Sequence, residues 1–293
     1  MTFSIIVVCL NAGEKLRETV ESIRSQTEQD YEIIIKDGGS EDEVTQACLN
    51  GYRGNHGGGD KVPDTAFAER IRLYCSKDAG IYDAMNQAVQ HVLGDYVLFL
   101  NCGDTFYDNS VLAQVKEQIL RGERREGQQM PQTAGVSPSR HIFYGNIYER
   151  RTGALVQSNP VIDDFACYRN IPCHQACFYA AGLLKEKQFD TSYTVRADYE
   201  HFLWCYYKGN AKTVYMPIIV ALYEGGGFSE TKENEKKSRR EHRDIVKKYM
   251  PAGSVRRYRL IMLVTLAPLR TWIAGNPVTA GFYQTIKRKL YKR

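Results

Sequence analysis

Short apolar runs alternate with helix-like segments over the first third of the chain. Four short apolar runs, the first of them rich in β-branched residues, are each followed by turn-forming or polar residues: Ser4–Leu10, Tyr31–Lys36, Ile71–Cys75 and Asp95–Leu100. They lack strict apolar–polar alternation, which is typical of strands buried on both faces. Lys15–Gln26 and Gly80–Leu93 carry apolar residues at helical spacing, and Glu41–Leu49 is also expected to be helical. This order predicts an α/β fold with a mostly parallel central sheet and helices on both faces.

The remainder of the chain predicts shorter strands, two helices and two loops. Gly51–Asp64 and Arg121–Arg140 are polar and rich in turn formers, so both are expected to be loops or insertions. The expected helices are Arg196–Tyr207 and the strongly charged Thr231–Tyr249. The expected strands are His141–Tyr148, Gly153–Gln157, Ala176–Tyr179, Lys212–Tyr215 and Ile218–Tyr223, the last two separated around Pro217.

The charge is distributed unevenly along the chain. The 43% hydrophobic and 25% charged content is that of a globular protein, with a net charge of +5. Residues 232–293 contain 17 Lys and Arg but only 4 Asp and Glu, so the rest of the chain is acidic. An acidic body lacks the clustered cations that a phosphate backbone requires, which excludes nucleic acid as its partner.

The basic C-terminal region also contains an apolar run, Leu260–Ala267. Cations beside apolar residues are typical of a helix at an anionic membrane surface. We therefore expect two parts: a catalytic domain over residues 1–230 and a basic helical extension over residues 231–293 that associates with a membrane. The alternative is a solvated helix that packs one apolar face onto the body.

Eight cysteines are scattered through the chain without a C-x-x-C pair, which favours free thiols in a reducing compartment. Cys173-His-Gln-Ala-Cys177 could be half of a zinc site, but no second ligand pair has suitable spacing. The chain starts without a basic leader before its first apolar run. We expect a cytoplasmic protein, peripheral at the inner face of the cell membrane.

Polar residues follow each of the first four predicted strands. Ligands bind beyond the carboxyl ends of such strands, so these residues are expected to form one crevice. Asp37 could accept hydrogen bonds from a nucleobase or a ribose, and Gly38 would allow close backbone approach. The alternative is a tight turn whose Ser40 caps the next helix. The residues at the four strand ends are Asn11, Asp37-Gly38-Gly39-Ser40, Ser76-Lys77-Asp78 and Asp104.

Asp104 is the candidate metal ligand, because a carboxylate at the end of a buried strand suits Mn²⁺ or Mg²⁺. The metal would neutralise charge on a departing diphosphate, whose oxygens could complete the coordination together with water. The alternative is that Asp104 only caps a helix or forms an Asx turn.

Four motifs in this order resemble glycosyltransferase family 2, particularly its colanic-acid-type members in bacterial surface-polysaccharide assembly. The resemblance covers residues 3–225 or so. The motifs are Ser4-Ile-Ile-Val-Val-Cys-Leu-Asn11, Asp37-Gly-Gly-Ser40, Lys77-Asp78-Ala-Gly80-Ile-Tyr-Asp-Ala-Met-Asn86 and Phe99-Leu-Asn-Cys-Gly-Asp104.

This resemblance implies a Rossmann-like GT-A fold, a nucleoside-diphosphate-sugar donor and inversion at the anomeric carbon. Asp104 would match the last acid of the family's D-x-D metal motif, whose first acid is replaced here by Cys102. Asp37 would hold the base. The other implied donor-binding residues are Asn11, Gly38, Ser40, Lys77, Asp78 and Asn86.

The family also places a general base at the start of a later helix, where Arg196-Ala-Asp198-Tyr-Glu200 fits. Asp198 is the expected base and Glu200 the reserve, since a helix start favours an ionised carboxylate. The alternative is that Asp198 only caps the helix. His174 is expected to line the donor or acceptor pocket, or else to be a structural histidine.

The predicted activity is transfer of a sugar to a carbohydrate or lipid-linked oligosaccharide acceptor in surface-polysaccharide synthesis. Two alternatives remain open from the sequence. A sugar nucleotidyltransferase would need a Gly-rich basic loop after the first strand, and Asn11-Ala-Gly-Glu-Lys15 is a poor version of one. A non-catalytic nucleotide-sugar-binding protein would fit the incomplete metal motif.

Overall fold

The computed structural model describes residues 1–53, 65–127, 140–225 and 231–265. The chain divides into two compact units, Met1–His242 and Arg243–Arg293. The expected boundary between residues 230 and 231 stays a prediction.

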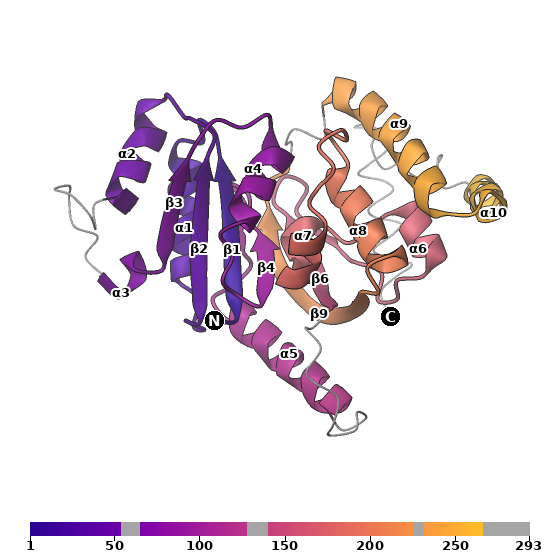
Figure 1. Ribbon diagram of the computed structural model, residues 1–293, viewed down its shortest axis with the longest axis horizontal. Helices are drawn as coiled ribbons and strands as arrows, with labels where there is room; N and C mark the ends of the chain where they lie inside the picture. The colour runs from indigo at the N-terminus through magenta and orange to yellow at the C-terminus, as the bar shows by residue number, and fades with distance from the viewer. Residues whose placement is uncertain (54–64, 128–139, 226–230, 266–293) are drawn as a thin grey trace. The chain divides into compact units, whose positions relative to one another are not determined.

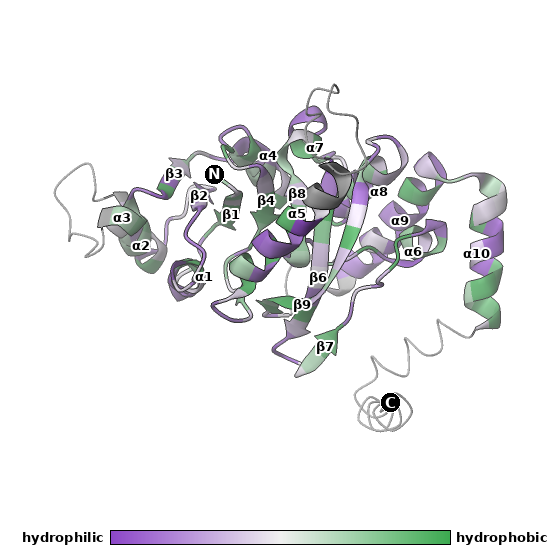
Figure 2. Cartoon of the chain, turned by 90° about the horizontal axis from the view of Figure 1, so that it is seen from below, coloured by the Kyte–Doolittle hydropathy of each residue, from purple (hydrophilic) through white to green (hydrophobic). Residues whose placement is uncertain are grey.

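Four parallel strands form the first half of the central sheet: β1 (Phe3–Cys9), β2 (Tyr31–Asp37), β3 (Ile71–Cys75) and β4 (Tyr96–Phe99). Every residue of β1, β2 and β4 is buried, as expected for strands covered on both faces. The helices α1 (Glu14–Arg24) and α4 (Ile81–Val89) lie on opposite faces of these strands (Figures 1 and 2). The carboxyl ends of the four strands therefore meet at one edge of the sheet.

The second half of the sheet is mixed. The strand order is β3-β2-β1-β4-β8-β6-β9-β5, with β7 paired to β6. β8 (Cys177–Ala180) runs antiparallel to β4 and to β6 (His141–Glu149), whereas β6 and β9 (Lys212–Tyr223) are parallel. The α/β prediction is confirmed, and its parallel character is concentrated in β3-β2-β1-β4.

The remaining described elements are short strands and helices around this sheet. They are α2 (Glu43–Arg53), α3 (Thr65–Ala68), β5 (Thr105–Phe106), α5 (Val111–Gly127), β7 (Ala154–Val156), α6 (Asp164–Arg169), the 3₁₀ helix η1 (His174–Ala176), α7 (Ala181–Glu186), α8 (Ala197–Tyr207), α9 (Lys232–Tyr249) and α10 (Ala252–Val264).

Two loop predictions require correction. Arg121–Gly127 is the end of α5 rather than a loop, because good helix-forming Arg and Glu residues continue a helix already anchored by buried Leu112, Val115 and Ile119. Gly51–Arg53 is the end of α2. The other parts of the two predicted loops, residues 54–64 and 128–139, lie outside the described residues.

The two late strands expected around Pro217 form one continuous strand, β9. A proline has no N–H to donate to a neighbouring strand, which is tolerated at bulges. The pairing of β9 with β6 shifts register between Tyr144 and Asn146, opposite Met216–Ile218. The irregularity thus accommodates Pro217 without ending the strand.

The charged segment Thr231–Tyr249 is helical as predicted, being almost entirely α9. α10 follows it within the basic region, and residues 266–293 lie outside the described part. Of the described helices, none has the length and apolar character needed to cross a membrane.

Candidate active site

The loop after β2 is organised by the Asp37 carboxylate, which is 2% exposed. It accepts hydrogen bonds from the Gly39 amide at 3.1 Å and from the Ser40 hydroxyl at 2.5 Å. The Ser40 oxygen in turn accepts from the Asn11 amide at 2.8 Å, and the Asn11 side chain accepts from the Glu41 amide at 2.8 Å. These bonds join the loops after β1 and β2. Asp37 therefore shapes its own turn, and its contact with a nucleobase stays a prediction.

A buried lysine that the sequence analysis overlooked joins this cluster to the loop after β3. The Lys36 ammonium group donates to the carbonyls of Asp37 at 2.9 Å and Ser76 at 2.6 Å, and lies 3.2 Å from an Asp78 carboxylate oxygen. A Cβ atom added at Gly38 would lie only 2.6 Å from that carboxylate, so the position excludes a side chain. Asp78 is thus neutralised by Lys36 at the edge where a nucleotide is expected.

Lys77 and Asn86 differ in their availability to a ligand. Lys77 is exposed beside Gly39. Asn86 is 9% exposed on α4, and its amide group exchanges two hydrogen bonds of 2.9 Å with the backbone of Phe189. Lys77 is therefore free to approach a donor, whereas Asn86 holds the chain near Phe189 against α4.

Asp104 is buried behind the loop after β4. Its carboxylate accepts from the Gln175 side chain at 2.9 Å and from the Glu224 amide at 3.1 Å. Burial raises the pKa of Asp104, and the hydrogen bonds from Glu224 and Gln175 only partly offset this effect. Among the described residues, no group of three or more His, Cys, Asp or Glu side chains could hold a metal ion. The protein side chains described here thus do not build a metal site by themselves.

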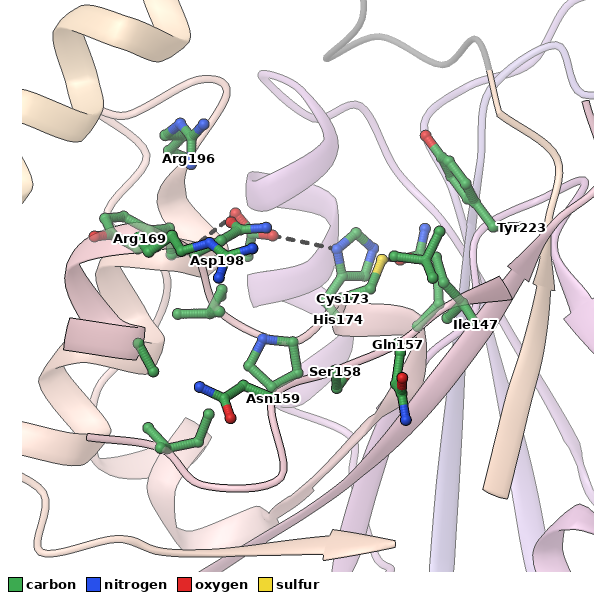
Figure 3. Close-up of a pocket in the computed structure, with 18 of the residues that line it drawn as sticks. Ile147, Gln157, Ser158, Asn159, Arg169, Cys173, His174, Arg196, Asp198 and Tyr223 are labelled. Carbon is green, nitrogen blue, oxygen red and sulfur yellow. Dashed lines mark hydrogen bonds and ion pairs between the residues drawn. The ribbon is translucent and has the colours of Figure 1, made fainter. Parts of the chain in front are cut away.

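Asp198 lies in the first turn of α8 and contacts three groups. One carboxylate oxygen accepts from the Tyr82 hydroxyl at 2.9 Å and from the Tyr199 amide at 2.8 Å. The other lies 3.3 Å from His174 Nδ1 (Figure 3). Burial raises the pKa of Asp198, but the hydrogen bonds from His174, the Tyr82 hydroxyl and the Tyr199 amide outweigh burial and lower the pKa overall. The carboxylate is therefore ionised at neutral pH.

His174 connects Asp198 to the motif after β4. Its Nε2 atom lies 3.0 Å from the Asn101 side-chain amide nitrogen. With the amide oriented in this way, Nε2 accepts a hydrogen bond and Nδ1 carries the proton that faces Asp198. The Asn101 side-chain oxygen is buried and has no hydrogen-bond partner among the described residues. His174 thus belongs to a polar chain running from Asn101 to Tyr82.

Asp198 and His174 line a cavity of about 800 Å³. Its wall combines the segment after β7, the end of α6 and the start of α8. Figure 3 shows Asp198 and His174 pointing toward each other at one side of this space. Further lining residues are Tyr82, Gln157, Asn159, Arg169, Gln175, Arg196, Tyr223 and Ser238.

The predicted site residues thus fall into two groups. His174 and Asp198 contact each other and line the cavity, and Asp104 accepts a hydrogen bond from Gln175, which also lines it. The residues after β1, β2 and β3 form the second cluster and do not line the cavity. Glu200 faces neither group, since it is fully buried and pairs with Lys187 at 2.5 Å. Asp198 is therefore the carboxylate of α8 that a substrate can reach.

The zinc half-site is disfavoured by its surroundings. The Cys173 thiol donates to the Gln175 side chain at 2.6 Å, and Cys177 donates to the Cys173 carbonyl at 3.3 Å. Burial raises the pKa of the Cys173 thiol to about 12, which opposes the thiolate that zinc requires. All eight cysteines are free.

Comparison with known proteins gives a consistent family. Residues 4–124 match the family model described as Glycosyl transferase family 2. The chain is 33% identical over 231 residues to a PGL/p-HBAD biosynthesis glycosyltransferase of Mycobacterium tuberculosis. The match covers 78% of this chain and 79% of that protein.

Solved structures share the fold at low sequence identity. TarS of S. aureus, residues 1–349 in complex with UDP, has a TM-score of 0.60 and 15% identity over 93% of this chain and 78% of that chain. This chain spans 37% of a longer TarS chain, with a TM-score of 0.55. The mannosyltransferase PcManGT of Pyrobaculum calidifontis, in complex with GDP-Man and Mn²⁺, has a TM-score of 0.58 and 15% identity over 99% of this chain and 81% of that chain.

The strand order, the motif after β4 and the mycobacterial relative thus agree, and the chain belongs to glycosyltransferase family 2, with the GT-A fold and the sugar-transferring activity of a glycosyltransferase.

Proposed function

We propose that the protein is an inverting glycosyltransferase that uses a nucleoside-diphosphate-sugar donor. The acceptor is a carbohydrate or a lipid-linked oligosaccharide in bacterial surface-polysaccharide synthesis. The observation that carries this proposal is the ionised Asp198 carboxylate at the wall of the 800 Å³ cavity. A base in such a place can receive a proton from an acceptor hydroxyl bound in the cavity.

The transfer follows from this placement. The acceptor hydroxyl oxygen forms a bond to the anomeric carbon, while the bond from that carbon to the diphosphate oxygen breaks with its electron pair. The hydroxyl proton passes to Asp198. Attack opposite the leaving group inverts the anomeric configuration. His174 orients Asp198 and keeps it ionised, and Asn101 sets the tautomer of His174.

The donor is proposed to bind at the carboxyl ends of β1, β2 and β3. Asn11, Asp37, Gly38, Ser40, Lys77 and Asp78 gather there, with Lys36 neutralising Asp78. TarS with UDP and PcManGT with GDP-Man support a nucleotide-bound state for this fold. Asn86 and His174 would support the same site from α4 and η1.

The proposed metal is Mn²⁺ or Mg²⁺, as the Mn²⁺ complex of PcManGT suggests. Asp104 would be its carboxylate ligand. Because the described side chains do not form a complete ligand group, the donor diphosphate would have to supply further oxygens. When bound, the metal would neutralise charge on the departing diphosphate. Such an ion should therefore bind together with the donor and weakly without it.

The decisive experiment is Asp198→Asn, assayed by hydrolysis of UDP-, GDP- and dTDP-sugars and by transfer to simple glycosides, with and without Mn²⁺. We expect turnover to fall by a factor of about 10² or more, since general base catalysis contributes that much. Binding of the preferred donor, measured by thermal shift, should be retained. Glu200→Gln is the matched control on α8 and should keep turnover per folded molecule.

Three outcomes would contradict the proposal. An Asp198→Asn variant with wild-type turnover would remove the base from its proposed role. A wild-type protein that binds a donor yet turns none over would instead be a nucleotide-sugar-binding protein. Pyrophosphate-dependent exchange would point to a nucleotidyltransferase.

We also propose that the basic extension, residues 231–293, associates with an anionic membrane surface at the cytoplasmic face. Within it, α10 exposes Leu260, Leu263 and Val264, with exposed Arg256, Arg257 and Arg259 nearby. Apolar side chains beside cations suit the interface of a bilayer that contains anionic lipids. Such binding would bring the enzyme to a lipid-linked acceptor.

A further inference from the structure

The cavity beside Asp198 contains an unusual pair of arginines. Arg169 ends α6 and Arg196 immediately precedes α8, and both line the cavity. In Figure 3 they are drawn on the same side of the cavity as Asp198, with Tyr223 and Ile147 drawn on the other side. Two guanidinium groups that share one cavity with the proposed base need an explanation.

Neither guanidinium is neutralised by a described carboxylate. No hydrogen bond or ion pair with a described residue holds Arg169, which is exposed. Arg196 donates from Nε to the Ser238 hydroxyl at 2.7 Å, and its guanidinium lies 5.5 Å from the centre of the Tyr199 ring. Ser238 and Tyr199 thus hold the Arg196 side chain in place. Since a guanidinium has five N–H donors, the remaining ones can bind a ligand.

Asp198 does not balance these charges. Of the described residues that line the cavity, it is the one that carries a carboxylate. Its oxygens already accept from Tyr82, Tyr199 and His174. The cavity thus holds two permanent positive charges against one negative charge whose hydrogen bonds are directed elsewhere. An anion in the cavity would balance the surplus charge.

Neighbouring charge on α9 adds to this effect. Ser238 brings α9 to the cavity wall. The same helix carries exposed basic residues around Ser238: Lys236, Lys237 and Arg240, besides Arg239, which pairs with Glu235. Basic groups near a binding site raise the local concentration of anions and the rate at which an anionic ligand reaches the site.

We propose that the cavity binds an acceptor that carries a phosphate or carboxylate group, with this anion bound by Arg169 and Arg196 and the reacting hydroxyl at Asp198. The inference rests on the proposed function and names its acceptor class. A guanidinium binds both anions by paired hydrogen bonds, so the shared chemistry is a planar or tetrahedral oxyanion. A cavity of 800 Å³ falls in the size range of sites that enclose small ligands.

The donor diphosphate is a weaker candidate for this anion. The residues expected to bind the nucleotide after β1, β2 and β3 do not line the cavity, and His174 is the member of that predicted set that does. The two arginines come from the end of α6 and from the residue before α8, and they line the same cavity as Asp198. The position of the two arginines therefore fits an anion on the acceptor better than the diphosphate of the donor.

The test uses the full-length protein and three probes that share one disaccharide: neutral, carrying a uronate, and carrying a phosphate monoester. Binding is measured by calorimetry at low ionic strength. We expect at least one anionic probe to bind about tenfold more tightly than the neutral one, the gain given by one charge-assisted hydrogen bond. Arg169→Gln and Arg196→Gln should remove most of that preference. Raising the salt concentration should weaken it.

The matched control is Arg121→Gln. Arg121 is an exposed arginine on α5, paired with Glu117 away from the cavity. Its replacement should leave the preference unchanged. Arg169 has no described partner to lose, so its variant should fold even if Arg196→Gln is destabilised.

The outcomes distinguish a carboxylate acceptor from a phosphate acceptor. They also distinguish a failure of this inference from a failure of the proposed function. Preference for the uronate alone identifies an acidic sugar, and preference for the phosphate alone identifies a sugar phosphate; either supports the inference. Equal binding of the charged and neutral probes overturns it, as does a preference that Arg169→Gln retains. Failure of the proposed function would appear elsewhere, as unchanged donor hydrolysis in Asp198→Asn.

Discussion

His201 is a buried histidine on α8, the helix that also carries the proposed base Asp198. It is fully buried, close to the rings of Tyr179 and Phe189. Its Nε2 atom lies 2.9 Å from the Lys187 carbonyl, so the neutral ring donates there. Burial lowers the pKa of His201 to about 4, from an ordinary value of 6.5. The histidine is therefore neutral in the folded protein at neutral pH.

This pKa predicts an acid-sensitive contribution to stability. Between pH 6.5 and 4 the unfolded chain binds a proton at this ring and the folded protein does not, so stability is full above pH 6.5 and falls as the pH decreases toward 4. The loss at pH 5 should be about 2 kcal/mol. The measurement is the free energy of unfolding in urea at pH 7 and pH 5. The His201→Gln variant should lose about 2 kcal/mol less unfolding free energy than the wild type between pH 7 and pH 5. Equal losses in both proteins would show that His201 is not kept neutral by burial.

The sequence predicted single residues best where strand ends carry polar side chains. Of the residues expected from the motifs, His174 and Asp198 lie at one cavity and Asp104 contacts its lining residue Gln175, whereas their roles stay predictions. Lys36 was overlooked, because a lysine at the end of an apolar run looks like a residue leaving the sheet. Its partners, the Ser76 carbonyl and Asp78, lie some forty positions away. Such contacts depend on the pairing of β2 with β3, which periodicity does not specify.

At the scale of elements, α9 supports the start of α8. Glu241 of α9 is 6% exposed. Its carboxylate accepts from three consecutive amides that precede α8: Thr194 at 3.0 Å, Val195 at 3.0 Å and Arg196 at 2.9 Å. No side chain from the residue before the helix caps α8 itself. Since Asp198 lies in the first turn, we propose that Glu241 is a positioning residue for this proposed base.

We predict that Glu241→Gln loosens this turn. A neutral amide has one acceptor oxygen in place of two and carries no charge, so about 1–3 kcal/mol of stability should be lost. The turnover number for donor hydrolysis should fall more than donor affinity, because the proposed donor site lies at the ends of β1, β2 and β3. Glu235→Gln on the exposed part of α9, where Glu235 pairs with Arg239, should change stability by at most about 0.5 kcal/mol. A Glu241→Gln protein with an unchanged turnover number would contradict the positioning role.

Elements were predictable where apolar residues run continuously. The predicted ends of β1–β4 differ from the observed ones by at most one residue, since each strand contains an apolar run bounded by polar or turn-forming residues. The end of α5 was missed because its polar residues 121–127 resemble a loop in composition. The role of α9 was missed for a related reason: in a helix of basic residues, one buried glutamate gives no periodic pattern.

At the scale of the whole molecule, the basic extension contrasts with the acidic remainder. Residues 232–293 carry 17 basic and 4 acidic residues. In α10 the side chains of Leu260, Leu263 and Val264 are 62%, 56% and 73% exposed. These features belong to one segment and predict attachment to anionic vesicles. Replacing Arg256, Arg257 and Arg259 by Gln should weaken flotation with phosphatidylglycerol vesicles by a factor of about 10², at about 1 kcal/mol for each charge.

The decisive experiment compares three proteins: the wild type, the triple variant, and a separate variant that lacks the residues beyond Ser254. Both variants should lose flotation with anionic vesicles, and high salt should reproduce the loss in the wild type because it screens the charges. Vesicles of neutral phosphatidylcholine are the control and should bind all three proteins weakly. Donor hydrolysis in solution should continue in the triple variant, because its altered residues belong neither to the proposed donor site nor to the lining of the cavity. Equal flotation of the deletion variant would show that the extension is not the membrane-binding element.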